Sequence, residues 1–118
     1  MANRDWIIPP PTVYPDRKAI DRIIAVTAKY AGLSVDDLCS ASRTRDVYVP
    51  RAVAMRVCRD YTDASLTAIG AAFGGRDHTT IMSALRSFDK WADDDLRQSV
   101  DAIAALAGCF HKRKEAQQ

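Results

Sequence analysis

The sequence predicts an all-α fold, a bundle of about six helices that contains a helix-turn-helix. The apolar residues of every strong pattern recur with the 3.6-residue period of a helix, and no segment alternates as a strand would. Glycine, proline and N-capping side chains separate these periodic segments. The length of 118 residues suits one domain. We expect a flexible Pro-rich arm over 1–16, the helical domain over 17–113 and a tail over 114–118.

The first half of the chain predicts two helices, a loop and the start of a third helix. The first helix has one apolar stripe and ends at Gly32, a typical C-terminal cap. Ser34, with Asp37 three residues later, is typical of the start of a short second helix. The polar segment 40–45 predicts an exposed loop. Pro50 predicts the first turn of a third helix, because its missing N–H costs nothing there. The stripe of the first helix is Ile20, Ile23, Ile24 and Thr27, continuing to Ala31.

The second half predicts three further helices. Ser65 and Asp77 are typical N-caps, and Gly74-Gly75 between them predicts a tight turn. The last helix begins near the acidic residues 93–95, which the helix dipole favours, and its basic exposed end is expected at 111–114. The apolar stripes of the third to sixth helices are, in order, Ala54, Val57, Cys58 and Tyr61; Leu66, Ile69 and Phe73; Ile81, Ala84, Leu85 and Phe88; and Leu96, Val100, Ile103, Ala107 and Phe110.

Composition narrows the class of protein. No segment has the ~20 consecutive apolar residues of a membrane span, and the N-terminus lacks the order of a signal peptide, so we expect a cytoplasmic protein. The cysteines, Cys39, Cys58 and Cys109, are far apart and predict buried thiols; we expect no metal and no cofactor. The net charge is only +2, but residues 43–90 have eight basic and five acidic side chains. A local basic excess of this kind favours a nucleic-acid partner.

The residues most indicative of function follow the glycine turn. Five polar residues, Arg76-Asp77-His78-Thr79-Thr80, open a helix that is amphipathic further on. In a helix-turn-helix DNA reader, the N-terminal residues of the second helix meet base edges in the major groove. Catalysis by Asp77 and His78 with a nearby hydroxyl, or metal binding by His78, is a much weaker interpretation, because capping and base recognition explain the same residues.

Residues from about Ala19 to Trp91 resemble the C-terminal DNA-binding domain (domain IV) of the DnaA family, the bacterial chromosomal replication initiators. The segment 74–80 is similar to the family's GGRDHTT signature and is preceded by Ile69-Gly70 and Phe73. The resemblance implies a Trp-repressor-like helical fold. It also implies that the partner is double-stranded DNA containing short recognition sequences, called DnaA boxes, related to TTATCCACA. Further matches are Asp37-Leu38, Ser42-Arg43, Arg45, Pro50-Arg51, Ala54-Met55 and Ser65-Leu66.

The resemblance also implies roles for individual residues. Asp77, His78 and Thr79 would read bases in the major groove, and Arg43 would enter the adjacent minor groove. An Asp can accept from a cytosine amino group, and the Thr methyl can pack on a thymine methyl. Residues expected to contact or support the phosphate backbone are Arg45, Arg51, Arg59, Leu66, Arg76 and Thr80.

Departures from the family pattern affect affinity more than base reading. Ala52 stands where the family usually has glutamine, so we expect one backbone contact to be lost. Thr67 and Ala68 replace the usual proline and glutamate, which removes a capping-box partner of Ser65. The 118 residues contain no Walker motif, so we expect no nucleotide and no enzymatic activity.

We therefore expect a DNA-binding, nucleoid-associated protein of a bacterium, phage or plasmid that regulates replication initiation or transcription. The alternative is a protein-interaction module in replication control, which would bind a replication protein through Trp6-Ile7-Ile8 of the arm. The intact cluster from Arg76 to Thr80 counts against it. The sequence does not choose between activation and inhibition of initiation.

Overall fold

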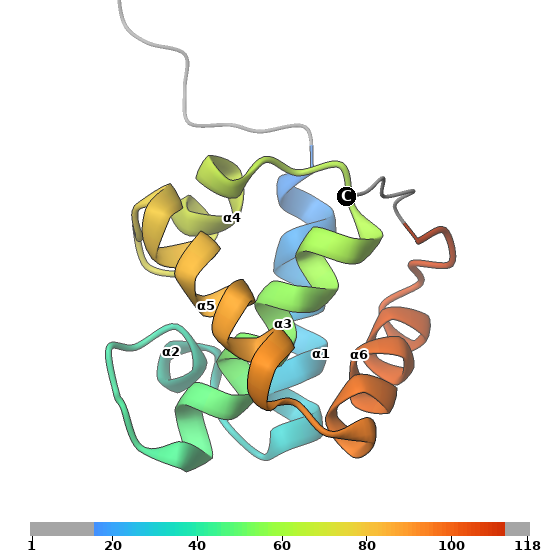
Figure 1. Cartoon of the computed structure of the whole chain (residues 1–118). Helices are drawn as coiled ribbons and strands as arrows, with labels where there is room; N and C mark the ends of the chain where they lie inside the picture. Colours follow the sequence, from blue (N-terminus) through green and yellow to red (C-terminus); the bar gives the residue numbers. More distant parts are fainter. Residues whose placement is uncertain (1–15, 113–118) are drawn as a thin grey trace, which may run out of the picture.

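A computed structural model describes residues 16–112 of the chain as six helices, without a strand in that range (Figure 1). This confirms the predicted all-α fold. The helices are α1 (Arg17–Ala31), α2 (Val35–Leu38), α3 (Arg45–Tyr61), α4 (Leu66–Ala72), α5 (His78–Trp91) and α6 (Asp94–Leu106). No helix within residues 16–112 is both long enough and apolar enough to cross a membrane. The proposed arm lies outside the described residues except for Asp16, and so does the proposed tail.

α3 is the central helix of the bundle, and each of the other five helices packs against it (Figure 1). Because neighbours surround it, α3 buries residues on most of its circumference rather than on a single stripe. Its buried residues are Ala52, Val53, Ala54, Met55, Val57 and Cys58. Together with the buried faces of α1, α4, α5 and α6 they form one contiguous core.

The first helix matches its prediction except at Ala31, which was predicted to continue the buried stripe but is exposed at the last position of the helix. Ile20, Ile23 and Ile24 are buried, and Gly32 ends the helix in the left-handed conformation with φ of 74°. The buried hydroxyl of Thr27 donates to the carbonyl of Ile23 at 2.7 Å, which satisfies a polar group that would otherwise destabilise the core.

The predicted start of the third helix is wrong. α3 begins at Arg45, so Pro50 lies inside the helix rather than in its first turn, and Arg45 belongs to the helix rather than to the loop. The carbonyl of Thr44 accepts from the amides of Val47 and Tyr48 at 3.0 and 2.8 Å, and this closes a turn before the proline. Five residues into a helix, Pro50 removes only one backbone hydrogen bond, and the many buried residues that follow it outweigh that loss.

The predicted end of the last helix is also wrong. α6 ends at Leu106, and Gly108, with φ of 80°, reverses the chain. Ala107 still closes the core, and its carbonyl accepts from Arg22 Nε of α1 at 2.7 Å. Phe110, predicted on the buried stripe, is therefore 74% exposed. His111 and Lys112 are exposed but follow an irregular segment, so they are not a helix end.

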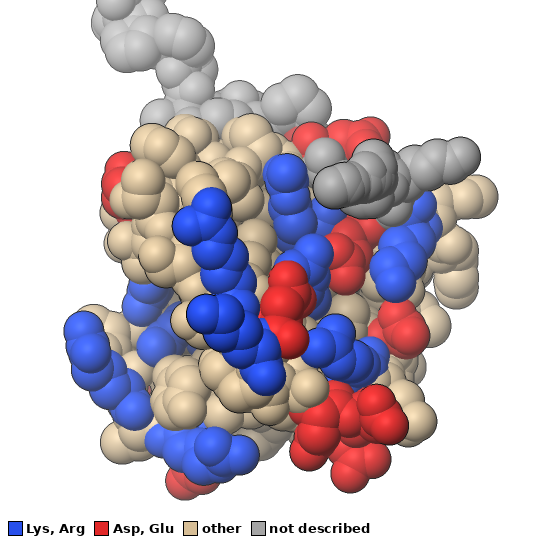
Figure 2. All heavy atoms as spheres, in the orientation of Figure 1, with Lys and Arg blue, Asp and Glu red and all other residues tan. Residues whose placement is uncertain are grey.

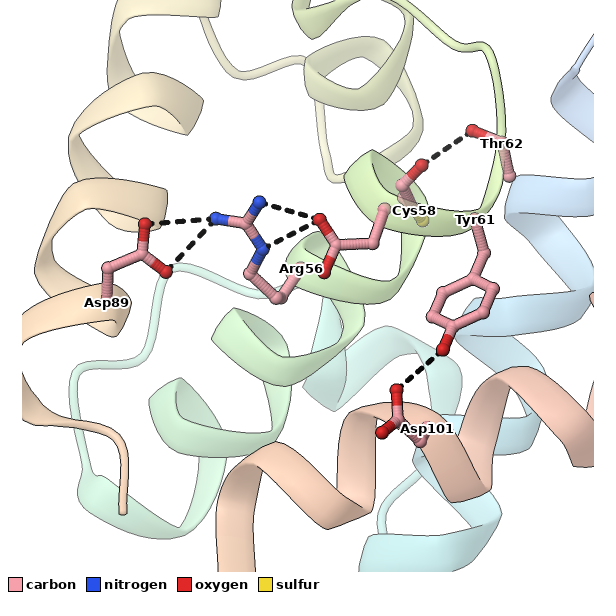
Figure 3. A network of polar contacts seen from close by, with 7 residues as sticks. Arg56, Cys58, Tyr61, Thr62, Asp89 and Asp101 are labelled. Atoms are coloured by element: carbon pink, nitrogen blue, oxygen red, sulfur yellow. Dashed lines mark hydrogen bonds and ion pairs between the residues drawn. The ribbon is translucent and has the colours of Figure 1, made fainter. Parts of the chain in front are cut away.

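Polar contacts fix α5 and α6 against the central helix (Figure 3). Arg56 of α3 donates to Asp60 one turn further on, at 2.6 Å, and to both carboxylate oxygens of Asp89 on α5, at 3.2 Å. Tyr61, predicted on the buried stripe, is only half-buried because its hydroxyl reaches outward to Asp101 of α6, at 2.5 Å. Burial and this hydrogen bond to a carboxylate raise the pKa of Tyr61 to about 12.

Of the three cysteine thiols, Cys58 is fully buried as predicted, whereas Cys39 and Cys109 are half-buried. All three are free. Burial raises the pKa of Cys58 far above its ordinary value and raises that of Cys39 as well. Within residues 16–112, no three side chains of the metal-binding types lie together.

Candidate nucleic-acid interface

The helix-turn-helix is formed by α4 and α5 and the short turn that joins them. Ser65 caps α4 by accepting from the amide of Ala68 at 3.0 Å, so the cap persists although the capping-box partner is absent. The turn folds tightly over α4, where the amide of Arg76 donates to the carbonyl of Gly70 at 2.8 Å. A Cβ on Gly70 would lie 2.1 Å from the carbonyl oxygen of Arg76. The direction in which α5 leaves the turn therefore depends on a glycine at position 70.

The start of α5 presents a row of exposed polar side chains. Asp77 is the N-cap and accepts from both the amide and the hydroxyl of Thr79. These hydrogen bonds, the one from the hydroxyl foremost, lower the pKa of the Asp77 carboxyl. His78, Thr79 and Thr80 are exposed, and His78 Nδ1 lies 3.5 Å from the Asp77 carboxylate. The three predicted base-reading residues thus lie together at one exposed helix end.

The opposite side of α5 anchors the helix to the bundle. Ile81, Leu85 and Phe88 are buried against α3 and α4. The ring of Trp91 lies edge-on to Phe88, at 5.2 Å between ring centroids, and to Tyr48 of α3, at 6.0 Å. A helix held along its length by apolar contacts keeps its exposed N-terminal residues in a fixed orientation.

The loop between α2 and α3 lies beside the start of α5. Arg43, predicted to enter a minor groove, is exposed in this loop. An open groove of about 510 Å³ separates loop and helix. It is lined by Ala41, Arg43, Tyr48, Arg51, Arg76 and Thr80. A second hollow of about 380 Å³ shares several of these residues and extends along α5 to Ser87 and Trp91.

Arg51 and Arg76, two of the residues predicted to contact phosphates, line this groove but also make internal hydrogen bonds. Arg51 donates to the carbonyls of Ser40 and Ser42, both at 2.8 Å. Arg76 donates to the carbonyls of Ser40, Cys39 and Phe73. Partial burial lowers the pKa of Arg51, and the neighbouring charge of Arg76 lowers it further.

The other predicted phosphate contacts are distributed around the same region. Thr80 lines the groove, and exposed Arg45 opens α3 beside the loop. Arg59 is half-buried in the last turn of α3, and Leu66 is half-buried at the first position of α4. Ala52, where a backbone contact was expected to be lost, is buried.

Sequence reasoning did not assign Tyr48, Ser87 or Trp91, although all three line the second hollow. Tyr48 and Trp91 are 43 positions apart, so no local spacing indicates that their rings meet.

Charge is unevenly distributed on this face (Figure 2). Basic side chains run along α5 and around the loop before α3, whereas acidic side chains gather where α6 begins. Arg86 and Lys90 are exposed on the outer face of α5. Such a charge distribution favours a polyanion along α5 and disfavours one near the start of α6.

The fold and this interface define a helix-turn-helix protein of the nucleic-acid-binding class. Residues 20–87 match the family described as the bacterial DnaA protein helix-turn-helix. The chain belongs to that family, whose helix-turn-helix is a DNA-binding module rather than a catalytic one.

Individual relatives agree with this assignment. The chain is 53% identical over 66 residues to a chromosomal replication initiator protein DnaA of Cutibacterium acnes. This match covers 56% of this chain and 13% of the relative. It is 41% identical over 95 residues to the corresponding protein of Xanthobacter autotrophicus, covering 79% of this chain and 19% of the relative. A crystal structure of a DNA replication initiation factor matches 78% of this chain and 29% of its own, with a TM-score of 0.69 and 30% identity. The chain therefore spans less than a third of each of these proteins.

Proposed function

We propose that this protein binds double-stranded DNA sequence-specifically at DnaA-box-like sites and thereby regulates replication initiation or transcription. The observation that supports the proposal most directly is the juxtaposition of two exposed elements across one basic groove. These elements are the polar start of α5, residues 77–80, and the loop that contains Arg43. A recognition helix in a major groove and a neighbouring arginine in the adjacent minor groove would straddle one phosphate strand, and that strand would follow the groove.

Each base-reading side chain has a defined task in this proposal. The Asp77 carboxylate accepts from a base amino group. Because the Thr79 hydroxyl already donates to Asp77, the Thr79 methyl is the group that meets a thymine methyl. His78 reads an adjacent base edge. Arg43 occupies an A/T-rich minor groove, whose narrow shape strengthens its negative potential.

Phosphate contacts hold the register without reading sequence. Thr80 lines the groove, Arg45 is exposed at the start of α3, and the half-buried Arg59 and Leu66 support the strand further along the surface. Arg51 and Arg76 add positive charge to the groove itself. Counterion release from such contacts makes binding depend steeply on salt.

The names of the relatives suggest the biological setting. Two of them are chromosomal replication initiator proteins, and the similarity covers only a small part of each. We propose that this chain occupies the same class of boxes, either competing with an initiator or helping it to load. Recruitment of a replication protein by Trp6-Ile7-Ile8 would involve residues outside those that the structure describes.

The test is fluorescence anisotropy with a labelled duplex containing TTATCCACA and a scrambled duplex, each at several salt concentrations. We expect a preference for the box of at least about 10³, the lower limit of specific binding. His78→Ala should cost about 1–3 kcal/mol on the box and little on the scrambled duplex, whereas Arg45→Ala should weaken both alike and reduce the salt slope by about 1.

Other outcomes would redirect the assignment. Equal binding to both duplexes would refute box recognition and require selection of the target from random DNA. Absence of binding to either duplex would refute DNA binding and favour a protein partner in replication control.

A further inference from the structure

The loop before α3 has no apolar anchor of its own. Residues 40–46 include no buried residue, and Ala41, Arg43 and Thr44 are exposed. Its side-chain hydrogen bonds are local. The Ser40 hydroxyl donates to the carbonyl of Asp37 at 2.7 Å and accepts from the amide of Ser42 at 3.3 Å. The Ser42 hydroxyl lies 3.0 Å from that of Thr44 and accepts from the Thr44 amide at 3.3 Å. Hydrogen bonds between residues only two or three positions apart do not fix the loop relative to the other helices.

Two guanidinium groups provide the tertiary anchor. Arg51 spans the loop from α3, with one nitrogen on the carbonyl of Ser40 and the other on that of Ser42. Arg76 reaches the loop from the other side, and its Nη2 donates to the same Ser40 carbonyl at 2.7 Å. Its Nη1 donates to the carbonyls of Cys39 and Phe73, which ties the loop to the turn of the helix-turn-helix.

We propose that Arg51 and Arg76 are positioning residues that hold Arg43 at a fixed offset from the base-reading end of α5. The inference rests on the proposed function, since the offset matters only if Arg43 and α5 read the same duplex. It changes the role expected for both arginines, because their donors are directed at loop carbonyls. A phosphate in the groove would meet groups already engaged in holding the loop.

The position of Arg76 in the chain makes the arrangement specific. It immediately precedes Asp77, the N-cap of the recognition helix, and its own amide donates to Gly70 of α4. One residue therefore links α4, the start of α5 and the minor-groove loop. With this link intact, major-groove and minor-groove contacts form together, without a separate cost for ordering the loop.

The first test measures amide hydrogen exchange in the 118-residue chain without DNA. Arg51→Lys retains the charge, but a single ammonium cannot replace a planar fork that spans two carbonyls. We expect exchange at residues 40–44 to rise at least about tenfold in Arg51→Lys and in Arg76→Lys. It should not change in the matched control Arg86→Ala, and exchange in α1 should not change in any variant, which excludes global unfolding. Loop exchange equal to that of the wild type would overturn the proposal.

The second test is a double-mutant cycle on the TTATCCACA duplex. Arg43→Ala should weaken binding at least about tenfold in the wild type, and less than about threefold in the Arg51→Lys background, because the loop there no longer presents Arg43. If the wild type binds the box and Arg43→Ala weakens binding by the same factor in both backgrounds, the positioning role of Arg51 is refuted. The proposed function would still stand. If the wild type binds no duplex, the proposed function fails, and the role of the two arginines in DNA reading fails with it.

Discussion

Gly70→Ala tests the geometry of the helix-turn-helix, because two physical effects act on this residue in opposite directions. Gly70 lies inside α4, where alanine is intrinsically more favourable by about 1 kcal/mol. Yet a Cβ at this position would lie 2.1 Å from the carbonyl oxygen of Arg76 and 3.0 Å from its carbonyl carbon. The obstacle is backbone rather than the end of a flexible side chain, so the turn and α4 must separate by about 1 Å.

The magnitude follows from three contributions. Overpacking against a fixed neighbour costs about 3 kcal/mol, at the upper end of the usual range because no side chain can move aside. Weakening the hydrogen bond from the Arg76 amide to the Gly70 carbonyl costs about 1 kcal/mol more. The gain in helix propensity offsets about 1 kcal/mol. We therefore expect Gly70→Ala to lower the free energy of unfolding by about 3 kcal/mol, despite being a favourable exchange for an isolated helix.

The assay is urea denaturation followed by circular dichroism, with Ala71→Gly as a control on the neighbouring, half-buried position. The control should lose about 1 kcal/mol from propensity alone. In the DNA assay Gly70→Ala should lose preference for the box, because a displaced Arg76 carries Asp77 with it. A Gly70→Ala protein that is as stable as the wild type, or more stable, would refute the close packing of α4 against the turn.

Three further predictions concern single polar groups. The folded pKa of Tyr61, about 12, lies above its ordinary value of 10.0, so its contribution to stability is complete below pH 10 and is lost as the pH rises to about 12. Because Asp101 is exposed to solvent, we expect Tyr61→Phe to remove only about 1 kcal/mol of that pH-dependent stability. The measurement is the free energy of unfolding from urea denaturation between about pH 8 and 12. An unchanged dependence of that free energy on pH would contradict the hydrogen bond. Thr79→Val should raise the pKa of Asp77 toward its ordinary value, observed by carboxyl NMR, because the largest cause of its depression is removed, and the thymine contact should survive. Cys58 should resist iodoacetamide until denaturant is added; rapid alkylation of the native protein would contradict its burial.

The helices that the sequence predicted best are those whose ends depend on local chemistry. Gly32 and Asp77 act through the backbone within one turn of their own positions, and both mark helix ends in the structure. The predicted start of the third helix was wrong because a proline is compatible with two positions. It can lie in the first turn of a helix, or in an interior where tertiary contacts outweigh one lost hydrogen bond. Only packing against the other helices distinguishes the two.

The end of α6 shows a second reason why apolar spacing alone does not predict where a helix ends. Phe110 continues the apolar spacing of the last helix, but Gly108 allows the chain to turn before that residue is reached. Since glycine is also tolerated inside helices, its presence alone did not predict the turn. The carbonyl of Ala107, which receives Arg22 from α1, is a tertiary contact without any sequence signal.

In the candidate site, too, residues that form a local motif could be predicted, whereas contacts between distant segments could not. A compact motif indicated Asp77, His78 and Thr79, because base-reading residues at a helix end are contiguous in sequence. The contacts of Arg51 and Arg76 could not be predicted. Their partners are backbone carbonyls up to 37 positions away, and carbonyl groups are the same in every sequence.

The two halves of α5 have separate tasks, and this separation has a consequence for variants. The half that ends in Trp91 is held by Phe88, by the Tyr48 ring and by the ion pair between Arg56 and Asp89. The first turn, from His78 to Thr80, has its side chains in solvent. Under the proposed function, we expect substitutions in the exposed turn to change the preferred DNA sequence while leaving the core unaltered. We expect substitutions at the anchored end to weaken binding to every DNA sequence, because they move the whole exposed turn.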